Sequence, residues 1–427
     1  MKRLFSILIV VVLLLSLSVG TFAAQPGFGN FTGDGSYTAG QFRDVRAADW
    51  FAPYVEDAFN FGFLRGKSLN MFDPAGLLTL GESVTLAARL RSIYHTGSAD
   101  FAASTPFYEV YAQYAMQHGI IDSHGDYNAL ATRSQFAMMI FNALPPTAFP
   151  VLNDIPDFGI NDVAPDVYFG SAVYSLYRAG VLSGSDRFGT FLSSSNITRA
   201  EASAILVRVA NPDTRISLTL PSEIPAEIIF QRKTSAVFMI ETFTPRGRSI
   251  RNGSGFFIDD TGLAVTSLHV LDNAASATIT LYDGTTYHVN GVIALSIYNN
   301  LAMLSIDSGE SRFNYLTLAD SDLIRTGGIV YALGSPIALF NTITEGIVSN
   351  TNREVRGEEL IQFTAPISFG SGGSPVLNTL GQVVGVAASS FANAQNLNLA
   401  IPVNFIRDLE IGELITLEEL NRREDED

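Results

Sequence analysis

The chain has 427 residues, of which 47% are hydrophobic and 16% charged, so it can build several packed domains and is not a disordered acidic polymer. Its formal net charge of -16 argues against nucleic acid or an anionic membrane as a main partner, because both require a basic surface. The absence of cysteine excludes disulfides, thiolate metal sites and a cysteine nucleophile, and only 5 histidines are available for chemistry.

Residues 1–24 have the layout of a secretory signal peptide. A basic start precedes an almost purely apolar run from Leu4 to Val19, and small residues follow up to Ala24. An uncleaved membrane anchor is the alternative, although the run is short for a span of about 20 residues. We therefore expect a secreted protein at the cell surface or cell wall, with no stable membrane span after cleavage.

Three similar segments follow, at 40–97, 104–146 and 158–212. Each contains an apolar stretch at helical spacing that ends in a glycine, as expected for a helix C-terminus; these are Gly62, Gly119 and Gly180. A second helix is expected after each glycine, over 82–93, 133–142 and 199–209. Threonines at 132 and 198 are suited to cap the last two of these helices, and Glu201 completes a capping box. Repeats of this period bury their apolar faces against one another.

These segments resemble S-layer homology repeats. The resemblance rests on Phe42, Asp44, Val45, Trp50, Gly62 and Phe72-Asp73-Pro74 in the first segment, on Thr132-Arg133-Ser134-Gln135 in the second and on Ile197-Thr198-Arg199-Ala200-Glu201 in the third. It implies attachment to secondary cell-wall polysaccharide, pyruvylated in this family, with the motif arginine holding the anionic sugar.

We carry the sugar-binding role onto Arg133 and Arg199, because a guanidinium fork suits a carboxylate and helix N-termini add positive charge. The first segment has Leu80 at this position, so its groove should be weakened. The alternative is that both arginines lie on solvated helix faces. Trp50, Phe59 and Tyr177 are expected in the core rather than as ligand platforms.

The hydrophobic pattern of the sequence changes from helical spacing to short β-branched runs after a proline-containing linker at 213–226. Short β-branched runs with frequent turns, such as 236–240, 277–281 and 383–386, predict an all-β domain over 227–412. The fold class is therefore multidomain α+β, an all-α repeat module followed by an all-β double barrel. Residues 413–427 are expected to form an acidic tail: a short helix is expected between Asn404 and the acidic end, and the last six residues are expected to fray.

Ordered blocks in this second half resemble the trypsin-like serine proteases, specifically the HtrA type with its double β-barrel. The blocks are Gly253–Ile258, Leu263–Val270, Asn299–Leu304, Tyr331–Pro336, Gly346–Ser349, Ala365–Pro375 and Ala400–Asn404. The resemblance implies a catalytic triad, in which a histidine takes the serine proton and a carboxylate fixes the tautomer of the histidine. It puts His269 at the position of the general base and Asn300 at that of the acid.

The resemblance also implies that the nucleophile is missing. In ungapped register Gly372 occupies the serine position, whereas Ser371 and Ser374 are displaced by one and two residues. The backbone amides of Gly370 and Gly372 are still expected to resemble an oxyanion hole. An amide at Asn300 does not neutralise a protonated imidazole as a carboxylate does.

Three functions remain open at this point. The barrel is a pseudoprotease that binds a peptide or protein without cutting it, or an active surface endopeptidase that uses His269 and Ser371, or a structural spacer. We favour the first, because both triad changes support it. The sequence contains no metal-binding motif such as His-Glu-x-x-His, and we expect neither a metal nor a cofactor.

Overall fold

The computed structural model describes residues 25–33, 35–334, 342–355, 357–390 and 396–424. The expected signal peptide at 1–24 lies outside these residues. The chain divides into two compact units that interleave in sequence. The first contains residues up to 154 together with 171–183 and 193–218, and the second contains 155–170, 184–192 and the chain from 219 onward. A search of the described residues for a helix able to cross a bilayer found none.

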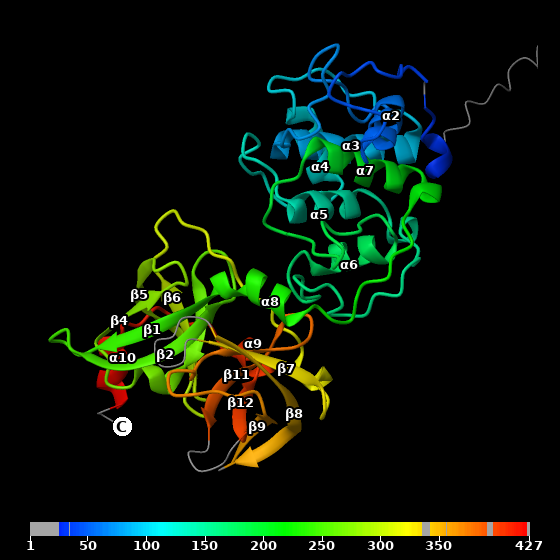
Figure 1. The fold of residues 1–427 in the computed structure, drawn as a ribbon. Helices are drawn as coiled ribbons and strands as arrows, with labels where there is room; N and C mark the ends of the chain where they lie inside the picture. Colours follow the sequence, from blue (N-terminus) through cyan, green and yellow to red (C-terminus); the bar gives the residue numbers. More distant parts are fainter. Residues whose placement is uncertain (1–24, 34, 335–341, 356, 391–395, 425–427) are drawn as a thin grey trace, which may run out of the picture. The chain divides into compact units, whose positions relative to one another are not determined.

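Helices dominate the region before residue 218 (Figure 1). They are α2 (Ala52–Asn60), α3 (Leu80–Thr96), α4 (Glu109–Gln117), α5 (Arg133–Ala143), α6 (Gly170–Arg178) and α7 (Arg199–Ala210), with short 3-10 turns η1 (Phe28–Asn30), η2 (Pro146–Ala148) and η3 (Pro212–Thr214). The expected second helices of the three repeats thus correspond to α3, α5 and α7, whose bounds differ from the prediction by at most three residues at either end. Gly62, Gly119 and Gly180 have φ values of 74°, 66° and 72°, the left-handed conformation that ends a helix.

The N-termini of α3, α5 and α7 are built alike. Each starts with a capping box, in which a threonine accepts from the third backbone N–H and the third side chain returns the bond; the threonines are Thr79, Thr132 and Thr198. The residues just before them form a closed cycle of backbone hydrogen bonds. Leu78 donates to Ile197, Ile197 to Ala131 and Ala131 to Leu78, at 3.1, 3.1 and 2.9 Å. The three repeats of the sequence therefore meet as equivalent units.

Two of the three aromatic residues expected in the core are there. Phe59 is 8% exposed and Tyr177 is fully buried, but Trp50 is 58% exposed, so the expectation for Trp50 was wrong. Trp50 precedes α2, in a turn, and its ring makes edge contacts with its neighbours Phe51 and Tyr54. These contacts leave more than half of the residue exposed.

Two closed six-stranded barrels form most of the second unit, as the sequence predicts (Figure 1). The first contains β1 (Val237–Phe243), β2 (Ser249–Phe257), β3 (Leu263–Ser267), β4 (Ser276–Thr280), β5 (Thr286–Ser296) and β6 (Leu301–Ile306). The second contains β7 (Ile329–Gly334), β8 (Thr342–Val355), β9 (Glu358–Phe363), β10 (Pro375–Leu377), β11 (Val383–Ser390) and β12 (Asn398–Pro402).

Both barrels have the same topology. Neighbouring strands are antiparallel and run in the order first, second, third, sixth, fifth, fourth. Buried aromatic and branched residues such as Phe238, Phe257 and Leu304 fill the first barrel, and Val376, Val384 and Phe363 fill the second. Short helical segments complete this part of the chain: η4 (Thr234–Ala236), η5 (Leu268–Leu271), η6 (Ser321–Leu323), α8 (Ala226–Lys233) and α9 (Asn404–Arg407).

Segments 155–170 and 184–192 are part of the barrel unit, although the sequence assigns them to the third repeat. The fully buried amide of Gln382 donates to the carbonyls of Phe158 and Ile160, both at 3.0 Å. Arg407 pairs with Asp166 at 2.7 Å. The expected linker is also fixed at its end, because Ile224 is 3% exposed and donates its N–H to Thr379.

The expected acidic tail at 413–427 is ordered over its described part. Residues Leu417–Glu424 form helix α10, and Leu417 and Leu420 are buried in the core of the first barrel. Asn421 donates to the carbonyls of Leu271 and Ala274, at 3.1 and 2.9 Å. The sequence predicts a short helix after Asn404, but it does not predict that Leu417 and Leu420, which lie on one face of α10 at a spacing of three residues, pack into the barrel core.

Candidate functional site

His269 follows strand β3 and lies in the turn η5, at the end of the first barrel. Its side chain is half-buried. The Arg251 guanidinium donates to its carbonyl oxygen and also pairs with the Asp272 carboxylate at 3.1 Å. The Arg251–Asp272 ion pair therefore holds the backbone of His269, and the two opposite charges largely cancel.

Asn300 lies directly before β6, the strand that pairs with β3. Its φ is 50°, a left-handed conformation that asparagine tolerates better than most residues. Its carbonyl accepts from the Leu268 N–H at 3.0 Å, and its side-chain Oδ1 accepts from the His269 N–H at 2.9 Å. The orientation of the amide follows from this second bond, because a flipped amide would oppose two donors.

This orientation turns the Asn300 amide nitrogen toward the imidazole. Nδ2 lies 3.0 Å from Nδ1 of His269, closer than Oδ1 at 3.3 Å. An amide nitrogen only donates, so the shorter of these two contacts favours Nδ1 of His269 as the acceptor, and on this geometry we assign the imidazole proton to Nε2. An active triad needs the opposite tautomer, with Nε2 free to take the proton of the nucleophile.

The pKa of the His269 imidazole is lowered from its ordinary value, which favours the neutral form. Burial is the main cause, because desolvation penalises the imidazolium. The hydrogen bond with Asn300 and the Asp272 carboxylate offset part of this lowering of the pKa, and the Arg251 guanidinium adds to it. The lowered pKa favours the neutral imidazole, and the assigned tautomer places its proton on Nε2. His269 is therefore interpreted as a neutral donor through Nε2–H.

Gly372 is the residue that faces the imidazole. A Cβ built on Gly372 would lie 3.0 Å from Nε2 and 3.2 Å from Cε1 of His269. The loop that carries Gly372 connects β9 and β10 of the second barrel and is held to the first by the Ser254 N–H, which donates to the Gly372 carbonyl at 2.8 Å. The two barrels therefore bring His269, Asn300 and Gly372 together, as an HtrA-type register implies.

Neither neighbouring serine reaches the imidazole. The Ser371 hydroxyl accepts from the Ser368 N–H at 3.2 Å, and the Ser374 hydroxyl donates to the Ser371 carbonyl at 2.6 Å. Both serines are buried, at 4% and 1% exposure. Ser374 packs against Gly334, where a Cβ would come within 2.1 Å of its oxygen. Within the described residues, neither hydroxyl has a hydrogen bond to His269.

The loop around Gly372 consists of two consecutive turns. Ser371 donates its N–H to Ser368 and Ser374 donates to Ser371, with φ values of 88° at Gly370 and 87° at Gly373. The N–H groups of Gly370 and Gly372 donate to no residue that the structure describes. These two amides, which the sequence proposes as an oxyanion hole, are available to an acceptor.

The two arginines assigned to sugar binding are packed within the first unit. Arg199 is 4% exposed, donates to the carbonyls of Phe72 and Arg65 at 2.9 and 2.6 Å, and lies over the Phe72 ring. Arg133 is 6% exposed and pairs with Glu201. Neither lies on a solvated helix face, which was the alternative. Both guanidinium groups already have partners: backbone carbonyls for Arg199 and the Glu201 carboxylate for Arg133. A ligand would have to share or replace these partners.

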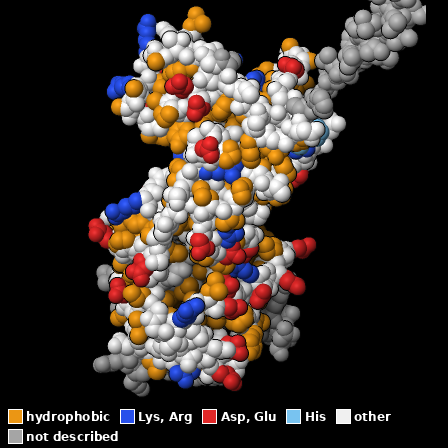
Figure 2. Space-filling view, turned by 90° about the vertical axis from the view of Figure 1, so that its right-hand side faces the viewer, with side chains coloured by type: hydrophobic (Ala, Val, Ile, Leu, Met, Phe, Trp, Pro, Cys, Tyr) orange, Lys and Arg blue, Asp and Glu red, His pale blue; other side chains and the backbone are white. Residues whose placement is uncertain are grey.

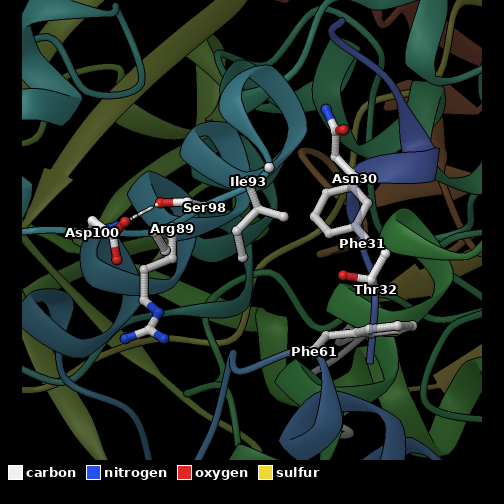
Figure 3. A pocket seen from close by; sticks show the side chains of 10 residues that line it. Asn30, Phe31, Thr32, Phe61, Arg89, Ile93, Ser98 and Asp100 are labelled. Carbon is white, nitrogen blue, oxygen red and sulfur yellow. Dashed lines mark hydrogen bonds between the residues drawn. The ribbon is translucent and has the colours of Figure 1, made fainter. Parts of the chain in front are cut away.

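A separate cavity of about 220 Å³ lies in the first unit. Figure 3 shows the Arg89 guanidinium on one side of it and Phe31 and Phe61 on the other. Arg89 donates to the Gly62 carbonyl, while its buried Nε has no partner within the described part of the chain. Neither Arg133 nor Arg199 lines this cavity. No sequence motif indicates this cavity, because the residues that line it are scattered between 30 and 100.

Figure 2 shows how charged side chains are distributed on one face of the molecule. On the face drawn in Figure 2, acidic and basic side chains are interspersed, and no extended basic patch is present on that face. An interspersed surface of this kind gives no long-range attraction for a polyanion.

Two kinds of domain are defined by these features. The trypsin-like peptidase domain family matches residues 253–386, and the S-layer homology domain family matches residues 41–82 and 159–203. The chain carries S-layer homology repeats followed by an HtrA-type, trypsin-like double-barrel domain. The matched residues include the first and third repeats but not 104–146.

Similar proteins include the HhoA protein of Synechocystis sp., 31% identical over 49% of this chain and 58% of its own. Mitochondrial serine protease HTRA2 is 35% identical in Bos taurus, over 42% of this chain and 41% of its own, and 34% identical in Drosophila ananassae, over 36% and 38%. The chain thus spans less than two thirds of the length of these relatives.

Proposed function

We propose that this chain is a surface-attached, HtrA-type protein whose barrel domain binds a peptide or protein segment without cleaving it. The observation that carries the proposal is Gly372, whose bare α-carbon faces the imidazole where a nucleophilic oxygen is required. The Asn300 amide supports it independently, because it holds the proton of His269 on the wrong nitrogen for a general base.

The test is reaction of the purified full chain with a fluorophosphonate probe, together with hydrolysis of labelled casein. We expect neither labelling nor hydrolysis above the level of a His269→Ala variant, because the hydroxyls of Ser371 and Ser374 are both engaged away from the base. Labelling that maps to Ser371 or Ser374 and disappears in His269→Ala would overturn the proposal in favour of an active endopeptidase.

We also propose that the repeats attach the chain to secondary cell-wall polysaccharide bearing acidic groups, in this family pyruvyl groups. The helix N-termini of α5 and α7, each with an arginine at the first position, support this proposal. Binding of the full chain to purified cell walls, measured by co-sedimentation, tests it. We expect Arg199→Ala to release the protein and the exposed-site control Arg46→Ala to retain it.

Arg199 also has a structural role, so a second variant is needed. Arg199→Lys keeps a cation next to Phe72 but loses the fork that suits a carboxylate. We expect intermediate retention for Arg199→Lys, with melting temperatures of both variants measured alongside. Full retention of Arg199→Ala at unchanged stability would remove the assigned role.

A further inference from the structure

We propose that the space beside Gly372 binds the terminal carboxylate of a peptide, so that the barrel recognises chain ends rather than internal segments. The inference rests on the proposed function and names the ligand class of the same site. It uses three groups: the imidazole of His269 and the backbone amides of Gly370 and Gly372, which donate to none of the residues that the structure describes.

The imidazole contributes a donor rather than an acceptor. Because Asn300 donates to Nδ1 at 3.0 Å and is itself fixed by the His269 N–H at 2.9 Å, the proton of His269 lies on Nε2. Nε2 faces Gly372. A protease would present a lone pair at this position and repel an anion, whereas this chain presents an N–H.

Glycine leaves the room that an anion needs. A methyl group on Gly372 would lie 3.0 Å from Nε2, so any side chain there would fill the space in front of the donor. The amides of Gly370 and Gly372, on the same pair of turns, donate to none of the described residues. A ligand oxygen at these half-buried glycines would therefore gain hydrogen bonds that no described residue accepts.

The donors favour a carboxylate over an internal peptide carbonyl. A carboxylate has two oxygens and accepts several bonds, and charge-assisted bonds are about twice as strong as neutral ones. The nearby Arg251 is paired with Asp272, so it adds little net charge, and the N–H donors must supply most of the recognition. Neutral donors bind an anion in a partly buried site without the desolvation cost of a buried cation.

The experiment uses the full chain and a pool of fluorescein-labelled pentapeptides with four alanines and a randomised last residue. One pool ends in a free carboxylate and the other in a carboxamide, and binding is followed by fluorescence anisotropy. We expect the acid pool to bind at least about tenfold more tightly, which corresponds to about 1.4 kcal/mol. Equal binding of the two pools would overturn this inference and leave peptide binding intact. No binding of either pool would count against the proposed function as well.

Two variants and a control connect the preference to the site. Gly372→Ala should abolish the preference for the acid by filling the space, whereas Gly412→Ala, where an added Cβ has ordinary room, should keep it. Asn300→Asp should also abolish it, because an aspartate accepts from Nδ1–H and removes the proton from Nε2. The 15N chemical shifts of the His269 ring report independently which ring nitrogen carries the proton in the Asn300→Asp variant. A retained acid preference in a folded Gly372→Ala variant would exclude the assigned position of the carboxylate.

Discussion

Restoring a serine at 372 and an aspartate at 300 tests the proposed reasons for the absence of proteolysis. These reasons are the missing hydroxyl at 372 and the proton that Asn300 keeps on Nε2 of His269. We predict that Gly372→Ser alone gives almost no hydrolysis, and that Gly372→Ser combined with Asn300→Asp gives measurable hydrolysis. The reason lies in Nδ2 of Asn300, 3.0 Å from Nδ1, which leaves Nε2 protonated and unable to accept the serine proton. In trypsin, the corresponding Asp-to-Asn change lowers kcat about 10⁴-fold, or about 5.4 kcal/mol at 1.36 kcal/mol per tenfold.

The contact at residue 372 sets a second limit. A Cβ at this position lies 3.0 Å from Nε2 and 3.2 Å from Cε1, so the imidazole must move by a few tenths of an ångström to admit serine. We therefore expect the double variant to remain slower than an HtrA protease while exceeding Gly372→Ser by about 10³ to 10⁴ in kcat/KM. The assay is casein hydrolysis with fluorophosphonate labelling, and adding His269→Ala should return the double variant to background. Equal rates for the single and double variants would refute the tautomer argument.

Three further predictions concern stability, measured by urea unfolding. Leu417→Ala should destabilise the barrel unit by about 2–4 kcal/mol because it opens a cavity under α10, whereas Glu418→Ala, on the exposed side, should change little. Gly373→Ala should be strongly destabilising, because its φ is 87° and the added Cβ would lie 2.1 Å from the Ser254 carbonyl oxygen; soluble expression with an unchanged midpoint would contradict this. Burial raises the pKa of Asp162 and lowers that of Lys233, each partly offset by the charge of the other. In Lys233→Met the Asp162 pKa should rise further. The native state then keeps a proton that the unfolded chain releases, so the deficit in unfolding free energy against wild type should grow as the pH rises above the ordinary Asp pKa, and a deficit independent of pH would contradict this.

Sequence patterns predicted the helices and barrels because each carries its own local signal. The helices α5 and α7 start at their capping threonines, which bond locally and need no tertiary partner. The capping box of α3 was readable in the same way, from Thr79 and Glu82. We missed it because Leu80 and Gly81 break the family motif, although neither residue takes part in the box.

The candidate site was predictable in register but not in orientation. The flanking barrel blocks fix which residues occupy the positions of His269, Asn300 and Gly372, and the built Cβ at 3.0 Å from Nε2 agrees with that register. The tautomer was not predictable, since it depends on which end of the Asn300 amide meets the His269 N–H. The direction of the Ser371 hydroxyl likewise depends on the turn that brings the Ser368 N–H to it.

The third repeat shows why domain boundaries cannot be taken from repeat boundaries. Asp162 holds the N–H groups of Phe191 and Leu192 at 2.8 and 2.7 Å, just as Asp44 holds those of Phe72 and Asp73 in the first repeat. The repeat pattern predicts this shared role.

The pattern does not predict that Asp162 also lies close enough to Lys233 of α8 for their charges to interact, or that Gln382 of the barrel donates to the Phe158 and Ile160 carbonyls. A barrel expressed from residue 227 would bury Lys233 without its carboxylate and the Gln382 amide without its acceptors. Unpaired buried charges and donors cost several kcal/mol, comparable with the whole stability of a domain. The folding unit of the barrel therefore includes residues 155–170 and 184–192, and the third repeat contributes to two structures at once.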